Sequence, residues 1–104
     1  MQYNKLVRDR IPDIIRSSGK EPIYRKLDNA EYMEALERKL DEEIAEFHES
    51  KSLEELADIS EVIIALVEAL GYPYVELIKA RVTKNRERGE FFHKIFLIEV
   101  KEND

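Results

Sequence analysis

Cysteine is absent from the 104 residues, and only three glycines and three prolines occur. Without cysteine, the chain can form neither disulfide bonds nor metal sites with thiolate ligands. No run of 18 apolar residues is present, so the sequence predicts no membrane-spanning helix. The opening residues lack the apolar core of a secretion signal, which favours a cytoplasmic protein.

Several chemistry-bearing motifs are also missing. There is no Gly-x-x-x-x-Gly-Lys loop and no Gly-x-Gly-x-x-Gly, which excludes the P-loop and Rossmann modes of nucleotide binding. No Ser/His/Asp or Cys/His set is available for nucleophilic catalysis. The formal net charge of −6 argues against binding to a nucleic acid polymer or to anionic lipid.

The composition is that of a folded chain, with 43% hydrophobic and 38% charged residues. We find no linker or repeat, so residues 1–104 form one expected domain. Capping boxes begin at Asp28 and Ser52, while Gly19, Gly71 and Gly89 follow helical stretches. Pro12 and Pro73 suit the first turn of a helix. These signals predict four helices, near residues 12–18, 28–50, 52–70 and 73–88.

Two short segments have the composition of strands. Residues 91–100 are rich in aromatic and β-branched side chains, and residues 23–27 alternate weakly. Because a two-stranded ribbon is marginal alone, we expect the two segments to pair and to pack on the helices. The predicted fold class is therefore mainly α, a four-helix bundle with a small two-stranded β accessory.

The stretch from Leu40 to Asp58 contains two carboxylate pairs, Glu43-x-x-Glu46 and Glu55-x-x-Asp58. Members of each pair are three residues apart, so on a helix they share a face. The short break at residues 50–52 predicts an antiparallel helical hairpin. Glu43 then lies opposite Asp58, and Glu46 lies opposite Glu55. Four carboxylates would face one another across about 8–10 Å between helix axes, on two levels about 4.5 Å apart.

Helical projection places some of these acids where apolar side chains are expected. Glu43 lies inside the apolar arc of its helix, and Glu55 lies inside that of the next. Burial of unpaired carboxylates is costly, and four together repel one another. A bound cation removes both objections, whereas a solvated acidic face with helix capping is the alternative for isolated acids.

The ligand type indicates which cation would bind. Carboxylate oxygens without cysteine or histidine suit a hard cation such as Mg²⁺ or Mn²⁺. A di-iron site would need Glu-x-x-His pairs, and neither His48 nor His93 has that spacing.

Basic residues that suit phosphate form two groups. Arg81, Lys84 and Arg88 fall within about 60° of one another near the end of the fourth helix. Lys5, Arg8 and Arg10 precede the first helix and form the second group. Neither group need bind phosphate. The first could instead interact favourably with the negative end of the helix dipole, and the second could belong to a solvated N-terminal arm.

Glu42-Glu43-x-x-Glu46 followed by Glu55-x-x-Asp58 resembles the metal motif of the all-α nucleoside triphosphate pyrophosphohydrolases, the MazG-like family. The segment from Tyr3 to Pro12 and the closing Lys84-x-x-x-Arg88-Gly-x-Phe91 are similar to short, single-domain members related to phosphoribosyl-ATP pyrophosphohydrolase. The resemblance covers nearly the whole chain. Glu90 stands where relatives often have glycine.

The resemblance implies a reaction and a division of roles. Glu43, Glu46, Glu55 and Asp58 would hold Mg²⁺. Lys84 and Arg88 would contact phosphates, with Arg81, Lys5 and Arg8 as further substrate-binding candidates. The family cleaves between the α and β phosphates, releases pyrophosphate and a nucleoside monophosphate, and usually works as a homodimer or homotetramer.

The residues leave several alternatives open. Glu42, Glu46 or a metal-bound hydroxide could activate the water, so Glu42, Glu43 and Glu46 are the candidate catalytic residues. The substrate could be a free nucleoside triphosphate, as in nucleotide-pool house-cleaning, or phosphoribosyl-ATP. Outside enzymes, the chain could be a non-catalytic metal or nucleotide sensor, or a structural bundle whose acidic face binds a basic partner.

Overall fold

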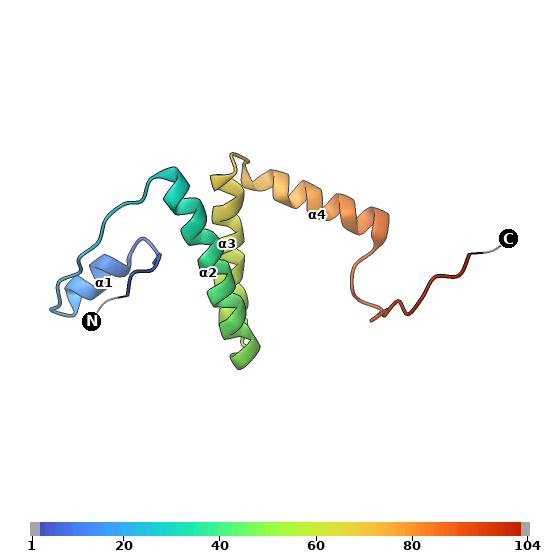
Figure 1. Cartoon of the computed structure of the whole chain (residues 1–104), viewed down its shortest axis with the longest axis horizontal. Helices are drawn as coiled ribbons and strands as arrows, with labels where there is room; N and C mark the ends of the chain where they lie inside the picture. Colours follow the sequence, from blue (N-terminus) through green and yellow to red (C-terminus); the bar gives the residue numbers. More distant parts are fainter. Residues whose placement is uncertain (1–2, 103–104) are drawn as a thin grey trace.

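In the computed structural model, which describes residues 3–102, the chain forms four α-helices and is mainly α, as predicted. The helices are α1 (Ile11–Ser17), α2 (Asn29–Ser50), α3 (Leu53–Ala69) and α4 (Tyr74–Arg88). Helices α2 and α3 lie side by side as an antiparallel hairpin, and α4 extends away from it (Figure 1).

The start of α2 is fixed by the predicted capping box. The Asp28 carboxylate accepts a hydrogen bond from the Glu31 backbone N–H at 2.9 Å, and the Glu31 side chain accepts one from the Asp28 N–H at 3.2 Å. Arg25 donates two hydrogen bonds to the Glu31 carboxylate, at 3.1 and 2.8 Å. These donors, Arg25 first, lower the pKa of Glu31 to about 2. The cap therefore holds an ionised side chain at the positive end of the helix dipole.

The turn between α2 and α3 is two residues long. Lys51 takes the left-handed conformation, with φ of 53°, which ends α2. Ser52 then begins α3, because its Oγ accepts a hydrogen bond from the Glu55 backbone N–H at 3.3 Å. So short a turn forces the helices to run antiparallel, which confirms the predicted hairpin.

Among residues 3–102, the fully buried residues lie on these two helices. Leu36 of α2 and Val62 of α3 are the buried hydrophobic residues among residues 3–102, and Glu43 is the buried charged residue. Exposed apolar side chains are spread over the rest of that range. None of the helices within residues 3–102 combines the length and apolar character needed to cross a bilayer.

Helix α4 does not pack along the hairpin. Gly71, with φ of +93°, and Pro73 turn the chain after α3, and α4 contacts α3 without reaching α2. The described chain extends over 71 × 32 × 20 Å (Figure 1). One copy therefore supplies four helices but does not close them into a bundle.

The predicted β ribbon is absent from residues 3–102 and this expectation is not supported. Residues 23–27 precede α2, whereas residues 91–100 follow the far end of α4, so the two segments lie on opposite sides of the molecule (Figure 1). A strand needs a neighbour at about 4.8 Å for its ladder of hydrogen bonds. Neither segment has one, and each stays extended and irregular.

Candidate metal centre

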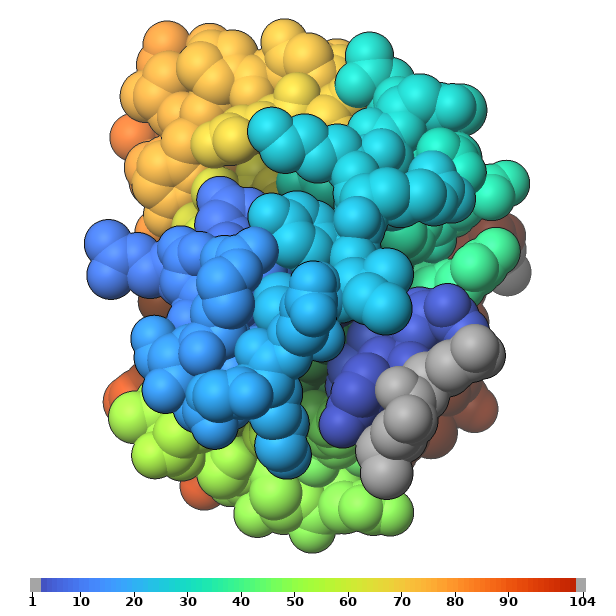
Figure 2. All heavy atoms as spheres, turned by 90° about the vertical axis from the view of Figure 1, so that its left-hand side faces the viewer, coloured from blue at the N-terminus to red at the C-terminus, as the bar shows by residue number. Residues whose placement is uncertain are grey.

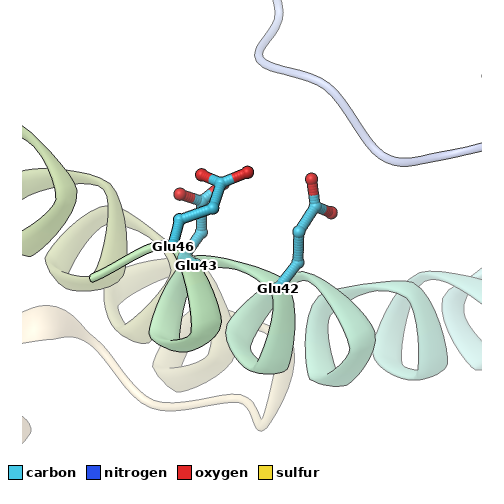
Figure 3. Close-up of side chains that lie close together, drawn as sticks. All are labelled: Glu42, Glu43 and Glu46. Carbon is cyan, nitrogen blue, oxygen red and sulfur yellow. The ribbon is translucent and has the colours of Figure 1, made fainter. Parts of the chain in front are cut away.

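Five carboxylates gather on one side of the hairpin and are called here the carboxylate cluster. Glu42, Glu43 and Glu46 extend from the same side of α2 (Figure 3). Glu55 and Asp58 reach the same place from α3. The predicted pairing of the two short motifs across the hairpin is therefore confirmed as geometry. The cluster is Glu42, Glu43, Glu46, Glu55 and Asp58.

The carboxylates form two overlapping groups of three. Glu42, Glu43 and Glu46 each offer an oxygen within 4.8 Å of the others, and so do Glu43, Glu55 and Asp58. Oxygens on opposite sides of a magnesium ion lie about 4.2 Å apart, because each bond is about 2.1 Å long. The limit of 4.8 Å is slightly above this distance, so the two groups are close to the spacing of divalent cation ligands, and Glu43 belongs to both.

Two oxygens in the cluster are buried without a partner. They are Oε2 of Glu43 and Oε2 of Glu55, and Glu43 is only 5% exposed. A buried carboxylate oxygen without a hydrogen-bond donor is costly, so this arrangement needs compensation. Burial, with Glu43 and Glu46 close by, raises the pKa of Glu55 to about 7. A divalent cation would supply the missing positive charge.

The side chain of Glu55 departs from the capping box expected for it. Its backbone N–H is capped by Ser52, but the Ser52 N–H donates to Ser50 Oγ at 3.3 Å and not to Glu55. The Glu55 carboxylate instead faces Glu43 and Glu46. Helix capping therefore does not explain why an acid occupies this position.

Cations of the same chain approach the cluster from one side. Lys39 Nζ lies 3.3 Å from Glu43 Oε1 and 3.5 Å from Glu42 Oε1. From the N-terminal arm, residues 3–10, Lys5 Nζ lies 3.6 Å from Glu42 Oε1, and Arg8 donates to Asp58 Oδ1 at 2.6 Å. Figure 2 looks onto this side, where the N-terminal residues and α1 lie in front of the hairpin.

Lys39 was not among the residues predicted from the sequence. Its position three residues before Glu42 and four before Glu43 is the signal that could have found it, because such residues are neighbours on a helix. Lys5 and Arg8 were predicted as phosphate contacts. The structure places both against the carboxylate cluster, so any phosphate bound there would lie within their reach.

A cleft of about 380 Å³ lies between the N-terminal arm and the hairpin. Its polar part is lined by Arg8, Lys39 and the acids Asp9, Glu43, Asp58, Glu61 and Glu68, and its apolar part includes Tyr32. Burial raises the pKa of Tyr32, with smaller effects from nearby acids, so its hydroxyl stays protonated as a donor. The volume is within the range of small-molecule sites. The remaining lining of the apolar part includes Leu36, Val62, Ile64 and Ala65.

The three predicted phosphate ligands of α4 are not brought to this cleft. Arg81, Lys84 and Arg88 do not line it, and none of them forms an ion pair within residues 3–102. Helix α4 contacts only α3 among the other helices and leads away from the cluster (Figure 1). Within residues 3–102, the expected carboxylates and the three expected cations of α4 therefore lie in separate places, whereas Lys5 and Arg8 lie at the carboxylates.

The residues fit a hard divalent cation. The donor set consists of carboxylate oxygens, which Mg²⁺ and Mn²⁺ prefer. Two of those oxygens are buried and unpartnered.

Comparison with known proteins adds a partial match. An uncharacterized protein of Mycolicibacterium smegmatis (strain ATCC 700084 / mc(2)155) is 60% identical over 42 residues, which are 40% of this chain and 43% of that protein. The match therefore spans less than half of the relative. No protein-family model matches the chain, and no solved structure matches it.

Proposed function

We propose that this chain hydrolyses a nucleoside triphosphate to a nucleoside monophosphate and pyrophosphate, with Mg²⁺ or Mn²⁺ bound by Glu43, Glu46, Glu55 and Asp58. The observation that carries the proposal is the pair of buried, unpartnered oxygens of Glu43 and Glu55 at the centre of the cluster. The resemblance to the MazG-like family supports the reaction class, with a role in cleansing the nucleotide pool of the cytoplasm.

The proposed role of each carboxylate follows from its exposure. When bound, Mg²⁺ polarises phosphoryl oxygens and offsets the negative charge that develops during cleavage. Glu43 and Glu55 contribute the buried oxygens, which favour a cation over water. Glu42 is partly exposed and Glu46 is exposed, so either can reach a water molecule and orient or deprotonate it.

The cleft gives the substrate a place beside the carboxylates. Its apolar wall, which includes Tyr32, Leu36 and Val62, suits a base and sugar. Arg8 and Lys39 at the polar end suit the phosphates, because charge-assisted hydrogen bonds to phosphate are strong. Lys5 lies at the same end of the carboxylate cluster.

The proposed assembly is a homodimer or homotetramer of MazG-like bundles. In such a bundle, the α2–α3 hairpins of two copies would pack against each other, because no other helix of the same copy packs along the hairpin. The small buried core of the single chain supports this, because two buried hydrophobic residues within residues 3–102 leave most apolar surface exposed.

A panel of nucleotides with Mg²⁺, scored for pyrophosphate and orthophosphate, tests the reaction. We expect pyrophosphate and monophosphate from at least one nucleoside triphosphate, with no turnover in chelator. Including phosphoribosyl-ATP decides between that substrate and free triphosphates. Orthophosphate with diphosphate as the sole products would contradict the cleavage position. Metal binding with no turnover of any substrate would favour a sensor.

A further inference from the structure

The single chain exposes much more surface than a compact protein of its mass. Its accessible surface is 9914 Å², whereas a compact monomer of 12.3 kDa exposes roughly 6,100 Å². Its radius of gyration is 18.9 Å, against about 13 Å for a compact domain of this length. The excess of about 3,800 Å² per chain is large enough to supply an interface of the size that obligate dimers bury.

Within residues 3–102, one apolar segment is almost fully exposed and one apolar helix surface is partly exposed. One is the tail, residues 90–102, where Phe91 is 99% exposed, Phe96 88% and Ile98 86%. The other is an apolar stripe on α3, formed by Leu56, Ile63 and the C-cap residue Leu70. These residues are seven apart and therefore lie on one side of the helix. The members of this apolar stripe are 44%, 36% and 64% exposed. Exposed apolar side chains gathered in one segment or on one helix face are typical of interaction sites.

The two surfaces do not meet within one copy. Helix α4 contacts α3 but not α2, and it carries the tail away from the hairpin (Figure 1). The tail can cover an apolar stripe only if that stripe belongs to another molecule. A second copy of this chain has the same stripe and the same tail. Each copy can therefore cover the stripe of the other, which gives a closed, symmetric dimer.

Charge favours the same partner. Residues 29–70, which include the hairpin, contain 13 acidic and three basic residues, a formal charge of −10. Residues 74–88, which form α4, contain two acidic and five basic residues, a formal charge of +3. Complementary charges steer association and fix its register. Within one copy, these oppositely charged elements meet only where α3 turns into α4.

We propose that α4 and the tail of one copy pack on the apolar stripe of a second copy, and that Lys84 and Arg88 thereby reach the carboxylate cluster of that second copy. Leu56 of the stripe directly follows Glu55 and lies two residues before Asp58. A helix with its side chains is about 10–12 Å across, so an arginine beside Leu56 lies within one helix width of the cluster. This role of the two cations rests on the proposed function, whereas the packing does not.

Cross-linking tests the packing without any activity measurement. Because the chain has no cysteine, single cysteines can be introduced cleanly at Ile63→Cys in one copy and Phe96→Cys in another. Oxidation of the coexpressed, differently tagged chains should give a disulfide between the two tags. The matched control replaces Phe96→Cys with Ser17→Cys on α1 and should give several-fold less. Equal yields, or a monomer in sedimentation at micromolar concentration, would overturn the proposal and assign the stripe to another partner.

Complementation tests the shared site. Glu43→Gln lacks a carboxylate and Arg88→Ala lacks a cation, so pyrophosphate release should fall at least about 100-fold in the first variant and about 10- to 150-fold in the second. Coexpression should restore pyrophosphate release to about one quarter of wild type, because random pairing leaves one intact site in each mixed dimer. An active wild type with no restoration would overturn the sharing and leave the proposed function standing. An inactive wild type with a positive cross-link would overturn the function and leave the packing standing.

Discussion

Two regions of the molecule differ in helix capping, burial and charge. One is the α2–α3 hairpin, and the other is the segment formed by α4 and the tail. The hairpin has capped helix starts, the buried residues of the chain and the carboxylate cluster. The segment from α4 onward has no buried residue within the described range, and it holds the basic residues predicted to bind phosphate. The hairpin is held by its own contacts, whereas the segment from α4 onward leaves its apolar and basic side chains exposed or half-buried.

The largest effect is expected at the centre of the hairpin. Glu43→Gln removes the one carboxylate shared by both groups of the cluster, so pyrophosphate release should fall at least about 100-fold, since even outer partners of metal ligands cost 10–100-fold. Glu49→Gln, an exposed acid on the same helix, is the matched control and should keep wild-type activity. Steady-state assays with Mg²⁺ decide this, and equal activity of the two variants would contradict the site.

The second prediction concerns α4. Lys84→Ala and Arg88→Ala should each lower turnover by about 10- to 150-fold, which corresponds to a lost charge-assisted hydrogen bond of about 1.5–3 kcal/mol. Mg²⁺ binding without nucleotide should not change. Lys79→Ala, whose partner is Glu76 of the same helix, is the control. Wild-type kinetics in both variants would mean that these cations act only on the helix dipole.

The third prediction uses pH on the hairpin alone. Burial raises the pKa of Glu55 to about 7 from an ordinary value of 4.5. The unfolded chain therefore releases this proton at lower pH than the folded chain does, and the free energy of unfolding without metal should fall between pH 4.5 and about 7. Glu55→Gln should flatten this decline, while the neighbouring Glu54→Gln should keep it. Denaturant unfolding in chelator at several pH values measures the free energy of unfolding of both variants. If Glu55→Gln showed the same decline with pH as Glu54→Gln, the decline would not come from Glu55.

The smallest effect is expected where the N-terminal arm meets the hairpin. Arg8 holds Asp58 at 2.6 Å with both side chains partly exposed, so the pair is worth about 0.2–1 kcal/mol. Arg8→Ala should free Asp58 and tighten Mg²⁺ binding without nucleotide by about 1.5- to 5-fold. Arg16→Ala breaks a pair with Asp13 on α1 and should leave the affinity unchanged. Calorimetric titration measures the Mg²⁺ affinity of each variant. Weaker binding by Arg8→Ala than by wild type would contradict competition between Arg8 and Mg²⁺ for Asp58.

Much of the hairpin was predictable because its signals are local. The cap at Asp28, the break at residues 50–52 and the spacing of Glu43, Glu46, Glu55 and Asp58 fix helix starts and register through neighbours in the sequence. Lys39 was missed although its spacing was visible. The direction of α4 was not predictable, because a turn at Gly71 is compatible with many angles between two helices.

The predicted strands failed for a different reason. Residues 91–100 have strand composition, but strand formation depends on a partner that composition does not specify. Within one copy, residues 23–27 are out of reach (Figure 1). The same composition also suits a tail that packs on another surface, which is the role we propose for it.

Thermal melting of wild type and Glu43→Gln, in chelator and in excess Mg²⁺, tests the central claim most directly. A cation that binds only the folded state raises its stability, so wild type should melt at a higher temperature with Mg²⁺ and Glu43→Gln should lose most of that increase. In chelator, Glu43→Gln should be at least as stable as wild type, because Lys39 keeps Glu42 as a partner at 3.5 Å. A marked loss of stability in chelator, or an unchanged response to Mg²⁺, would make Glu43 a structural partner of Lys39 and contradict the metal centre.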